Sequence, residues 1–135
     1  GGTTFGLLAI ADRFASLEVR PGVDVVMELT GFDEALRETD LVLTGEGLVD
    51  GQTAFGKTAM GVAERARRAG VPSICFGGGV TPEGAHFMHD LGVVTMPVVE
   101  RPMDLKEVVA AGTAPISRAA SRAAAILDLA DGLGR

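Results

Sequence analysis

The chain has 135 residues, 47% of them hydrophobic, which suits one soluble globular domain with a single core. Its formal charge of −6 argues against binding along a nucleic-acid backbone, and its 4% aromatic content argues against a base-stacking surface. No apolar run approaches the roughly 20 residues of a membrane span, and no signal peptide is recognisable. The single cysteine, Cys75, cannot form an internal disulfide, which favours a cytoplasmic protein.

The first third of the chain predicts a helix, a strand and a short helix. Residues 5–14 have helical spacing, and residues 23–29 form a β-branched run that predicts a strand. Thr30 is expected to cap the short helix, whose first turn contains Asp33 and Glu34. The residues of the first helix expected to face inward are Leu7, Leu8, Ile10 and Ala11.

The middle of the chain alternates strands and helices. A short strand is predicted over residues 41–44, followed by a polar glycine-rich loop over residues 45–53. A helix is predicted over residues 54–69, with Gly70 as its C′ residue. Because the strand and its loop directly precede a helix, the segment is typical of a ligand-binding connection.

A second strand and helix follow in the same order. Residues 73–76 form a buried apolar run that includes Cys75, and three glycines at 77–79 are expected to end this strand. Thr81 and Pro82 have the order of an N-cap and a first helical residue. Residues 92–99 predict a further strand.

The tail is predicted to be helical over residues 104–131, divided near Gly112 with Thr113 as a cap. One side of the second tail helix carries an apolar stripe. The stripe consists of Ile116, Ala119, Ala120, Ala123, Ile126 and Leu127.

These elements predict an α/β protein, residues 1–135 forming a single unit with the helical tail. Nearly continuous apolar strands between helices indicate a mainly parallel sheet with helices on both faces, a Rossmann-like three-layer arrangement. Ligands bind beyond the carboxyl ends of such strands. Two segments are expected there, residues 45–57 and residues 77–79.

The stretch from residue 44 to residue 57 combines glycines, carboxylates and a lysine. Glycines allow backbone N–H groups to approach an anion closely, and the N-terminus of the following helix adds partial positive charge. Lys57 can neutralise a phosphoryl group. Glu46 and Asp50 can hold a magnesium ion or accept a proton from a substrate hydroxyl. The segment therefore contains the parts that phosphoryl transfer requires.

Residues 51–58 also match the Walker A pattern of P-loop proteins. Six residues, 45–50, separate this pattern from the predicted strand end, whereas a P-loop begins where its strand ends. No later apolar strand ends in a Walker B aspartate, and the strand of residues 92–99 is followed by Glu100. A P-loop-like nucleotide-binding protein is therefore the less favoured alternative.

The same stretch resembles the signature of type 1 glycerate kinases, which runs approximately T-G-E-G-R-hydrophobic-D-x-Q-[ST]-x-x-G-K-x-P. The matching residues are Thr44, Gly45, Glu46, Gly47, Asp50, Gln52, Thr53, Gly56 and Lys57. The segments at residues 21–24, 31–34 and 70–72 are also similar to elements of the family, so the resemblance covers almost the whole chain.

The resemblance implies the C-terminal portion of a two-part α/β enzyme whose active site lies in a cleft. Such an enzyme uses ATP and Mg²⁺ to phosphorylate D-glycerate, usually to 2-phosphoglycerate. The N-terminal portion of the same enzyme would be the partner of this C-terminal portion. Whether the C-terminal portion is active alone, and whether the enzyme forms a homo-oligomer, are left open. The implied roles are catalytic for Asp50, Lys57 and Glu46, with Glu46 and Asp50 as magnesium ligands. Substrate and phosphate contacts are expected at Thr44, Gly45, Gly47, Gly51, Gln52, Thr53 and Gly56.

Two positions depart from the family pattern. Leu48 stands where the family has arginine, and Ala59 stands where it has proline. Because of this leucine, two alternatives stay open: the enzyme has impaired activity, or the chain is a non-catalytic α/β binding or assembly fragment.

Three further residues invite a functional interpretation. His86 and His89 are expected at the surface rather than at a metal site. Asp24 interrupts the predicted strand of residues 23–29 and is either a strand end facing water or a site residue.

Overall fold

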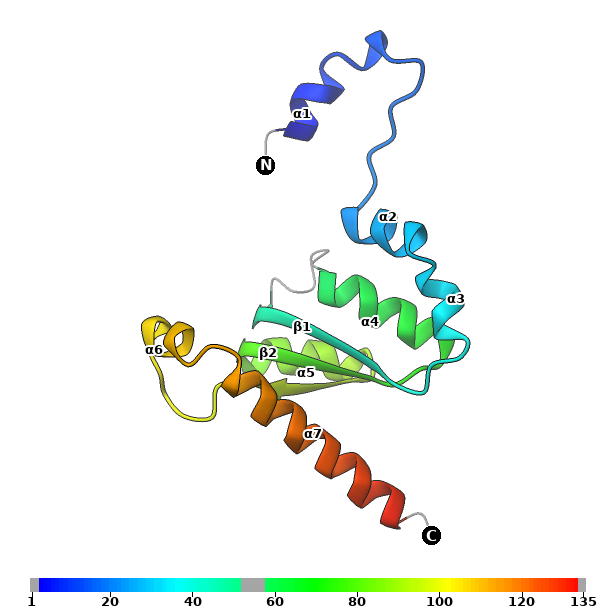
Figure 1. Ribbon diagram of the computed structural model, residues 1–135. Coiled ribbons are helices and arrows are strands. Elements are labelled where there is room, and N and C mark those ends of the chain that lie inside the picture. The colour runs from blue at the N-terminus through cyan, green and yellow to red at the C-terminus, as the bar shows by residue number, and fades with distance from the viewer. Residues whose placement is uncertain (1–2, 52–57, 134–135) are drawn as a thin grey trace.

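The computed structural model describes residues 3–51 and 58–133. Within these residues, parallel strands β1 (Val42–Val49), β2 (Ser73–Val80) and β3 (Val93–Pro97) form a sheet in that order (Figure 1). Helix α4 (Thr58–Ala69) connects β1 to β2, and α5 (Pro82–Asp90) connects β2 to β3. The predicted α/β fold with a parallel sheet is confirmed.

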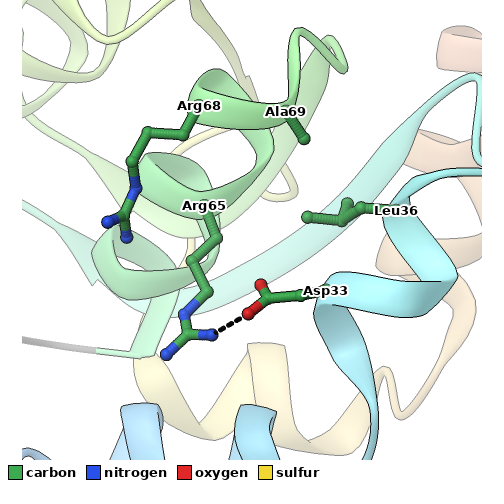
Figure 2. Close-up of a pocket in the computed structure, with 5 residues that line it drawn as sticks. All are labelled: Asp33, Leu36, Arg65, Arg68 and Ala69. Atoms are coloured by element: carbon green, nitrogen blue, oxygen red, sulfur yellow. Dashed lines mark hydrogen bonds and ion pairs between the residues drawn. The ribbon is translucent and has the colours of Figure 1, made fainter.

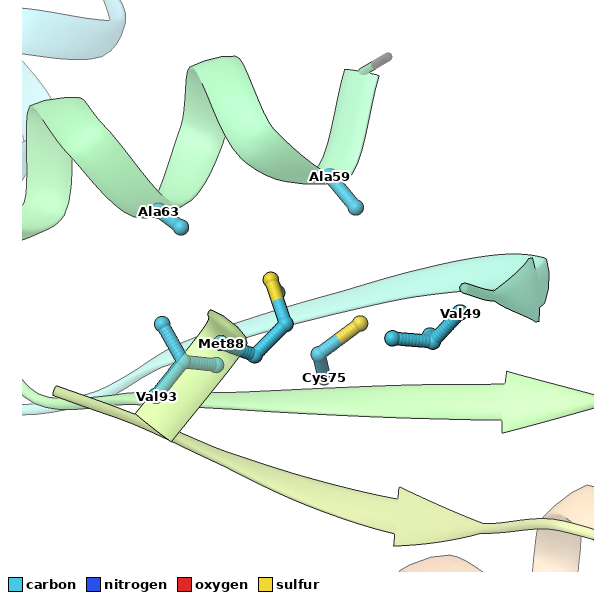
Figure 3. Close-up of a cluster of buried hydrophobic side chains, with 6 residues drawn as sticks. All are labelled: Val49, Ala59, Ala63, Cys75, Met88 and Val93. Atoms are coloured by element: carbon cyan, nitrogen blue, oxygen red, sulfur yellow. The ribbon is translucent and has the colours of Figure 1, made fainter. Parts of the chain in front are cut away.

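Helices cover both faces of the sheet. On one face, small residues of α4 and Met88 of α5 pack against the strands (Figure 3). The members of this cluster are Val49, Ala59, Ala63, Cys75, Met88 and Val93. On the other face, Ala119 and Ala123 of α7 (Ala114–Leu133) pack on Ile74 and Phe76. The alanines let the helices approach closely, and the predicted core position of Cys75 is confirmed.

The glycine-rich segments of both strands lie inside the sheet. The strand predicted to end at Thr44 continues to Val49, and the strand predicted to end before Gly77 continues to Val80. The two strands stay in one register throughout, from Val42 opposite Ser73 to Val49 opposite Val80. The predicted ends were wrong because the two glycine-rich segments pair with each other, Glu46 with Gly77 and Leu48 with Gly79, and this ladder compensates for the low strand propensity of glycine.

Both strands change the face to which their side chains point within these glycine-rich segments. Val42 and Val49 both pack towards α4, although an odd separation along a regular strand points side chains to opposite faces. Cys75 and Val80 share the same cluster in the same way. The change brings Val49, the last residue of β1, into the core.

The segment predicted as a strand over residues 23–29 is helix α2 (Gly22–Leu29). Val23 and Met27 lie four residues apart, so a helix brings both onto one side, where they contact Gly61 of α4. Met27 is 4% exposed. Packing on α4 thus overrides the strand propensity of the β-branched residues, and the strand prediction was wrong.

Helix α3 (Phe32–Leu36) follows α2 and is not capped by Thr30. Gly31 occupies the N-cap position with a φ of 68°, a left-handed conformation that glycine adopts without strain. The Thr30 hydroxyl instead donates to the Val26 carbonyl at 2.9 Å, at the end of α2. Asp33 and Glu34 lie in the first turn of α3 as predicted.

The N-terminal segment does not form the single inward-facing helix predicted over residues 5–14. It consists of α1 (Thr3–Leu8) and a 3₁₀ turn η1 (Ala11–Arg13), and it extends away from the sheet (Figure 1). Leu7, Leu8 and Ile10 are all more than two-fifths exposed. Their apolar spacing predicted burial, but these residues lie away from the described core.

The tail contains α6 (Leu105–Ala110) and α7, separated by Gly112 with a φ of 58°, as predicted. Only Ala119 and Ala123 of the predicted apolar stripe are buried, whereas Ile126 is 57% exposed. No helix in residues 3–51 and 58–133 combines the length and apolar character that crossing a membrane requires.

Candidate functional site

The predicted site residues divide between β1 and the connection that follows it. Thr44, Gly45, Glu46 and Gly47 lie within β1, while Asp50 and Gly51 come directly after its last residue. The predicted residues Gln52, Thr53, Gly56 and Lys57 lie outside the described residues. Of the described site residues, only Asp50 and Gly51 therefore lie beyond the carboxyl end of β1, where parallel sheets bind ligands, while the other four lie within the strand.

Glu46 is half-buried on the face covered by α4 and α5. It pairs with Gly77, two residues after Cys75, so strand alternation places Glu46 and Cys75 on the same face. Burial raises the pKa of the Cys75 thiol to about 11, and the negative charge of Glu46 adds to this rise. One carboxylate oxygen of Glu46 accepts the Gly47 N–H at 3.3 Å.

Asp50 follows Val49, which is fully buried, and is itself half-buried. The N–H of Thr81, directly after β2, donates to the Val49 carbonyl at 2.9 Å. This bond holds the end of β1 against the start of α5. Because α4 and α5 both begin at the carboxyl end of the sheet, the positive ends of their dipoles lie on the side where β1 delivers Asp50 (Figure 1).

The glycines of β1 and β2 differ in what surrounds them. A Cβ atom added to Gly78 would lie 2.5 Å from the Gly47 carbonyl oxygen, so the close approach of the strands requires glycine there. A Cβ atom added to Gly47 or Gly51 would meet no atom of the described chain within 4 Å. Packing within the described chain therefore does not explain glycine at these two positions, and both leave backbone open to a bound molecule.

Neither of two cavities in the described part of the chain is lined by a residue of β1 or by Asp50 or Gly51. A cavity of about 480 Å³ is lined by Asp33, Leu36, Arg65, Arg68 and Ala69 (Figure 2). A groove of about 540 Å³ runs between α2 and the start of α4, where Thr58 contributes to its wall.

The first of these cavities contains an ion-pair network that the sequence did not indicate. Arg65 of α4 donates to Asp33 at 2.6 Å and to Asp24 at 3.2 Å (Figure 2 shows the first contact). These hydrogen bonds, the one to Asp33 foremost, raise the pKa of Arg65. Asp24 is thus an ion-pair partner that joins α2 to α4, and two carboxylates already neutralise the guanidinium.

The histidines of α5 are surface residues, as predicted. His86 and His89 are each at least four-fifths exposed, and both lie within 4.0 Å of Asp90. Across the described ranges, no group of three or more histidine, cysteine, aspartate or glutamate residues is arranged to hold a metal ion.

The structure removes one of the two arguments against a P-loop. Since β1 extends to Val49, only Asp50 separates the strand from Gly51, and the predicted six-residue separation was wrong. As predicted, no Walker B aspartate follows the later described strands: β2 ends at Val80 and β3 at Pro97, and neither is followed directly by an aspartate.

The fold defines an α/β protein with a parallel sheet. Glycines and carboxylates lie in its outer strand β1 and directly after the carboxyl end of this strand. The sequence pattern that defines the glycerate kinase family matches residues 1–128. The chain belongs to the glycerate kinase family.

Individual relatives agree with this assignment. The chain is 35% identical over 127 residues to a glycerate kinase of Halalkalibacterium halodurans, covering 93% of this chain and 32% of that protein. It is 35% identical over 113 residues to a glycerate kinase of Bacillus cereus, covering 83% of this chain and 29% of the relative. It is 31% identical over 94 residues to a glycerate 2-kinase of Escherichia coli, covering 69% and 25% respectively. The chain thus spans about a third or less of the length of these relatives.

Proposed function

We propose that the chain provides the C-terminal portion of a glycerate kinase, in a protein of its relatives' length that transfers the γ-phosphoryl group of ATP to D-glycerate. The observation that carries this proposal is the family match over residues 1–128, which includes the carboxyl end of β1. The name of the Escherichia coli relative favours the 2-hydroxyl as the acceptor and 2-phosphoglycerate as the product. The setting proposed for this reaction is the cytoplasm.

The glycines at the end of β1 would contact phosphate. Gly47 and Gly51 leave open space where a side chain would otherwise stand, so their backbone can approach the phosphate oxygens closely. The N-terminus of the following helix adds partial positive charge on the same side. Lys57, which the sequence assigns to the same loop, would neutralise the charge that develops on the transferring group.

The carboxylates would handle the proton and the metal. In the proposed transfer, the glycerate hydroxyl oxygen bonds to the γ-phosphorus, the bond from that phosphorus to the ADP oxygen breaks, and Asp50 accepts the hydroxyl proton. Glu46 and Asp50 are oxygen donors of the type that Mg²⁺ prefers, and their half-buried positions near one strand end suit this ion. Bound Mg²⁺ would neutralise part of the phosphate charge. Mutagenesis can determine whether Asp50 accepts the proton or binds the metal.

A second candidate is a member of the family that does not catalyse the reaction. Leu48, in place of the family arginine, favours it. The side chain of Leu48 is directed at Gly79, where an added Cβ atom would lie 3.0 Å from Leu48 Cδ1. If an anion contact is missing here, Leu48→Arg should raise activity.

The test is an ATP-consumption assay on the full-length protein with D-glycerate and Mg²⁺. We expect turnover that depends on D-glycerate, with 2-phosphoglycerate as the product. Absence of turnover in both wild type and Leu48→Arg, together with binding of neither substrate, would exclude the kinase and leave the second candidate.

A further inference from the structure

We propose that the β2–α5 turn, through Gly84 and Thr81, positions Asp50 for the reaction. This inference rests on the proposed function, because it concerns the position of Asp50, a residue that the proposed reaction uses. The sequence patterns did not single out Gly84. The geometry that points to it is the contact between the first turn of α5 and the last residue of β1.

Gly84 lies against the main chain of β1 at the point where Asp50 begins. A Cβ atom added to Gly84 would be 2.5 Å from the Val49 carbonyl oxygen and 2.7 Å from the Asp50 nitrogen. Both neighbours are backbone atoms, so neither can rotate away as the end of a flexible side chain would. Only glycine allows α5 to lie this close to Asp50.

Thr81 joins the end of β1 to the first turn of α5 through two hydrogen bonds. Its N–H donates to the Val49 carbonyl at 2.9 Å, and its hydroxyl accepts the Gly84 N–H at 3.1 Å. Val49 itself is fully buried against Cys75 and Met88. The main chain that enters Asp50 is thus held by the core on one side and by the first turn of α5 on the other.

A change at Gly84 should therefore move Asp50 rather than only loosen the fold. The added methyl group must displace either α5 or the end of β1 to relieve the contact. A shift of about 1 Å at a reacting group can cost on the order of 100-fold in rate. We expect Gly84→Ala to lower kcat by about 10- to 100-fold while KM for ATP and D-glycerate changes little.

Gly61→Ala provides a matched control in the full-length protein. Gly61 is also a helical glycine without space for a methyl group, but its neighbour at 2.8 Å is the side chain of Val23, on the opposite side of α4 from the sheet. Both variants add one methyl group at a tight helix contact, and only Gly84→Ala touches Asp50. Hydrogen exchange over residues 42–51 reports the placement of the strand end independently of activity.

The proposal predicts lower kcat and faster exchange at residues 48–51 in Gly84→Ala, with both near wild type in Gly61→Ala. Equal losses of kcat in both variants, or unchanged exchange in Gly84→Ala, would overturn it. If Gly84→Ala fails to fold, Thr81→Val, which removes the hydroxyl acceptor, must lower kcat while Thr81→Ser retains it. Equal kcat in these two would also overturn the proposal.

Asp50→Asn in the same assay separates the two levels of the account. If Asp50→Asn loses activity while Gly84→Ala does not, the positioning role is wrong and the proposed site stands. If Asp50→Asn keeps wild-type kcat, the proposed site is wrong, and the positioning role falls with it.

Discussion

The carbonyl oxygen of Gly47 lies where a side chain at Gly78 would begin, with only 2.5 Å between this oxygen and the ideal Cβ position. The two residues lie on adjacent strands inside the glycine-rich segments. Gly78 therefore has a structural reason to be glycine. Gly47, with no described atom within 4 Å of its own ideal Cβ, has none.

The first prediction compares alanine substitutions at these two glycines. Gly78→Ala should lower the free energy of unfolding by about 1–3 kcal/mol, because the methyl group meets backbone that cannot move aside. Gly47→Ala should change stability by less than about 0.5 kcal/mol, yet weaken ATP binding if phosphate approaches this backbone. Denaturant unfolding and calorimetric titration measure the two quantities. A Gly47→Ala variant that binds ATP as wild type does would remove the ligand contact assigned to Gly47.

The second prediction concerns the ion pairs that join α2 and α3 to α4. Arg65→Met keeps the aliphatic stem and removes the hydrogen bonds to Asp24 and Asp33, so it should lower Tm. Arg68→Met is the control, since the Arg68 Nε donates only weakly, to the Glu64 carbonyl at 3.4 Å on the same helix. Arg65→Met should lower Tm clearly more than Arg68→Met does. Equal decreases in Tm would show that the ion pairs of Arg65 do not stabilise the packing of α2 and α3 on α4.

How far the sequence predicted the fold follows from the range of the interactions involved. Helix α5 was predicted correctly because its start depends on Thr81 and Pro82, which act locally. Residues 23–29 were predicted wrongly because their helix depends on contacts with Gly61, more than thirty positions away. The Arg65 network joins residues 32 and 41 positions apart, and no local pattern reveals such pairs.

The site was predicted in the same uneven way. The signature over residues 44–57 indicated the segment, whose role as the site stays a prediction. The signature did not indicate that the segment up to Val49 is a strand, because that depends on the glycines of β2 lying opposite. Nor did it indicate Gly84, whose importance arises only when α5 meets the end of β1.

The third prediction concerns the reactivity of Cys75. With its pKa raised to about 11, Cys75 should carry about two orders of magnitude less thiolate at pH 8 than a free cysteine of pKa about 8.5. Labelling by a thiol reagent should therefore be slow in the folded protein and fast in denaturant. Since the folded pKa is above the unfolded one, the neutral thiol favours folding below about pH 8.5, and this contribution is lost as pH rises towards 11. Equal labelling rates with and without denaturant would contradict the buried thiol.

The fourth prediction concerns Glu100, which lies between two arginines of α7. The Arg118 Nε donates to Glu100 at 2.7 Å, and Arg122 donates to the other carboxylate oxygen. The Arg118 hydrogen bond is the main cause that lowers the pKa of Glu100. Its stabilising contribution is therefore present above the unfolded pKa of about 4.3 and is lost as pH falls through the folded value. Glu100→Gln should lower Tm at pH 7, and its Tm difference from wild type should shrink as pH falls below about 4.3. A Tm difference that does not change with pH would contradict the ion pair.

The most direct test of the account is the turnover number for D-glycerate phosphorylation by full-length wild type, Asp50→Asn and Lys57→Ala, with Tm measured on each. A lysine that meets charge developing in the transition state, and an aspartate that accepts the substrate proton, should both act on kcat. We predict that kcat falls by about 10²–10⁴-fold in Asp50→Asn and comparably in Lys57→Ala, with Tm within a few degrees of wild type. If added Mg²⁺ restores part of the Asp50→Asn activity, Asp50 binds the metal rather than the proton. Stable Asp50→Asn and Lys57→Ala variants with wild-type kcat and KM for both substrates would contradict the assignment of the chemistry to the end of β1.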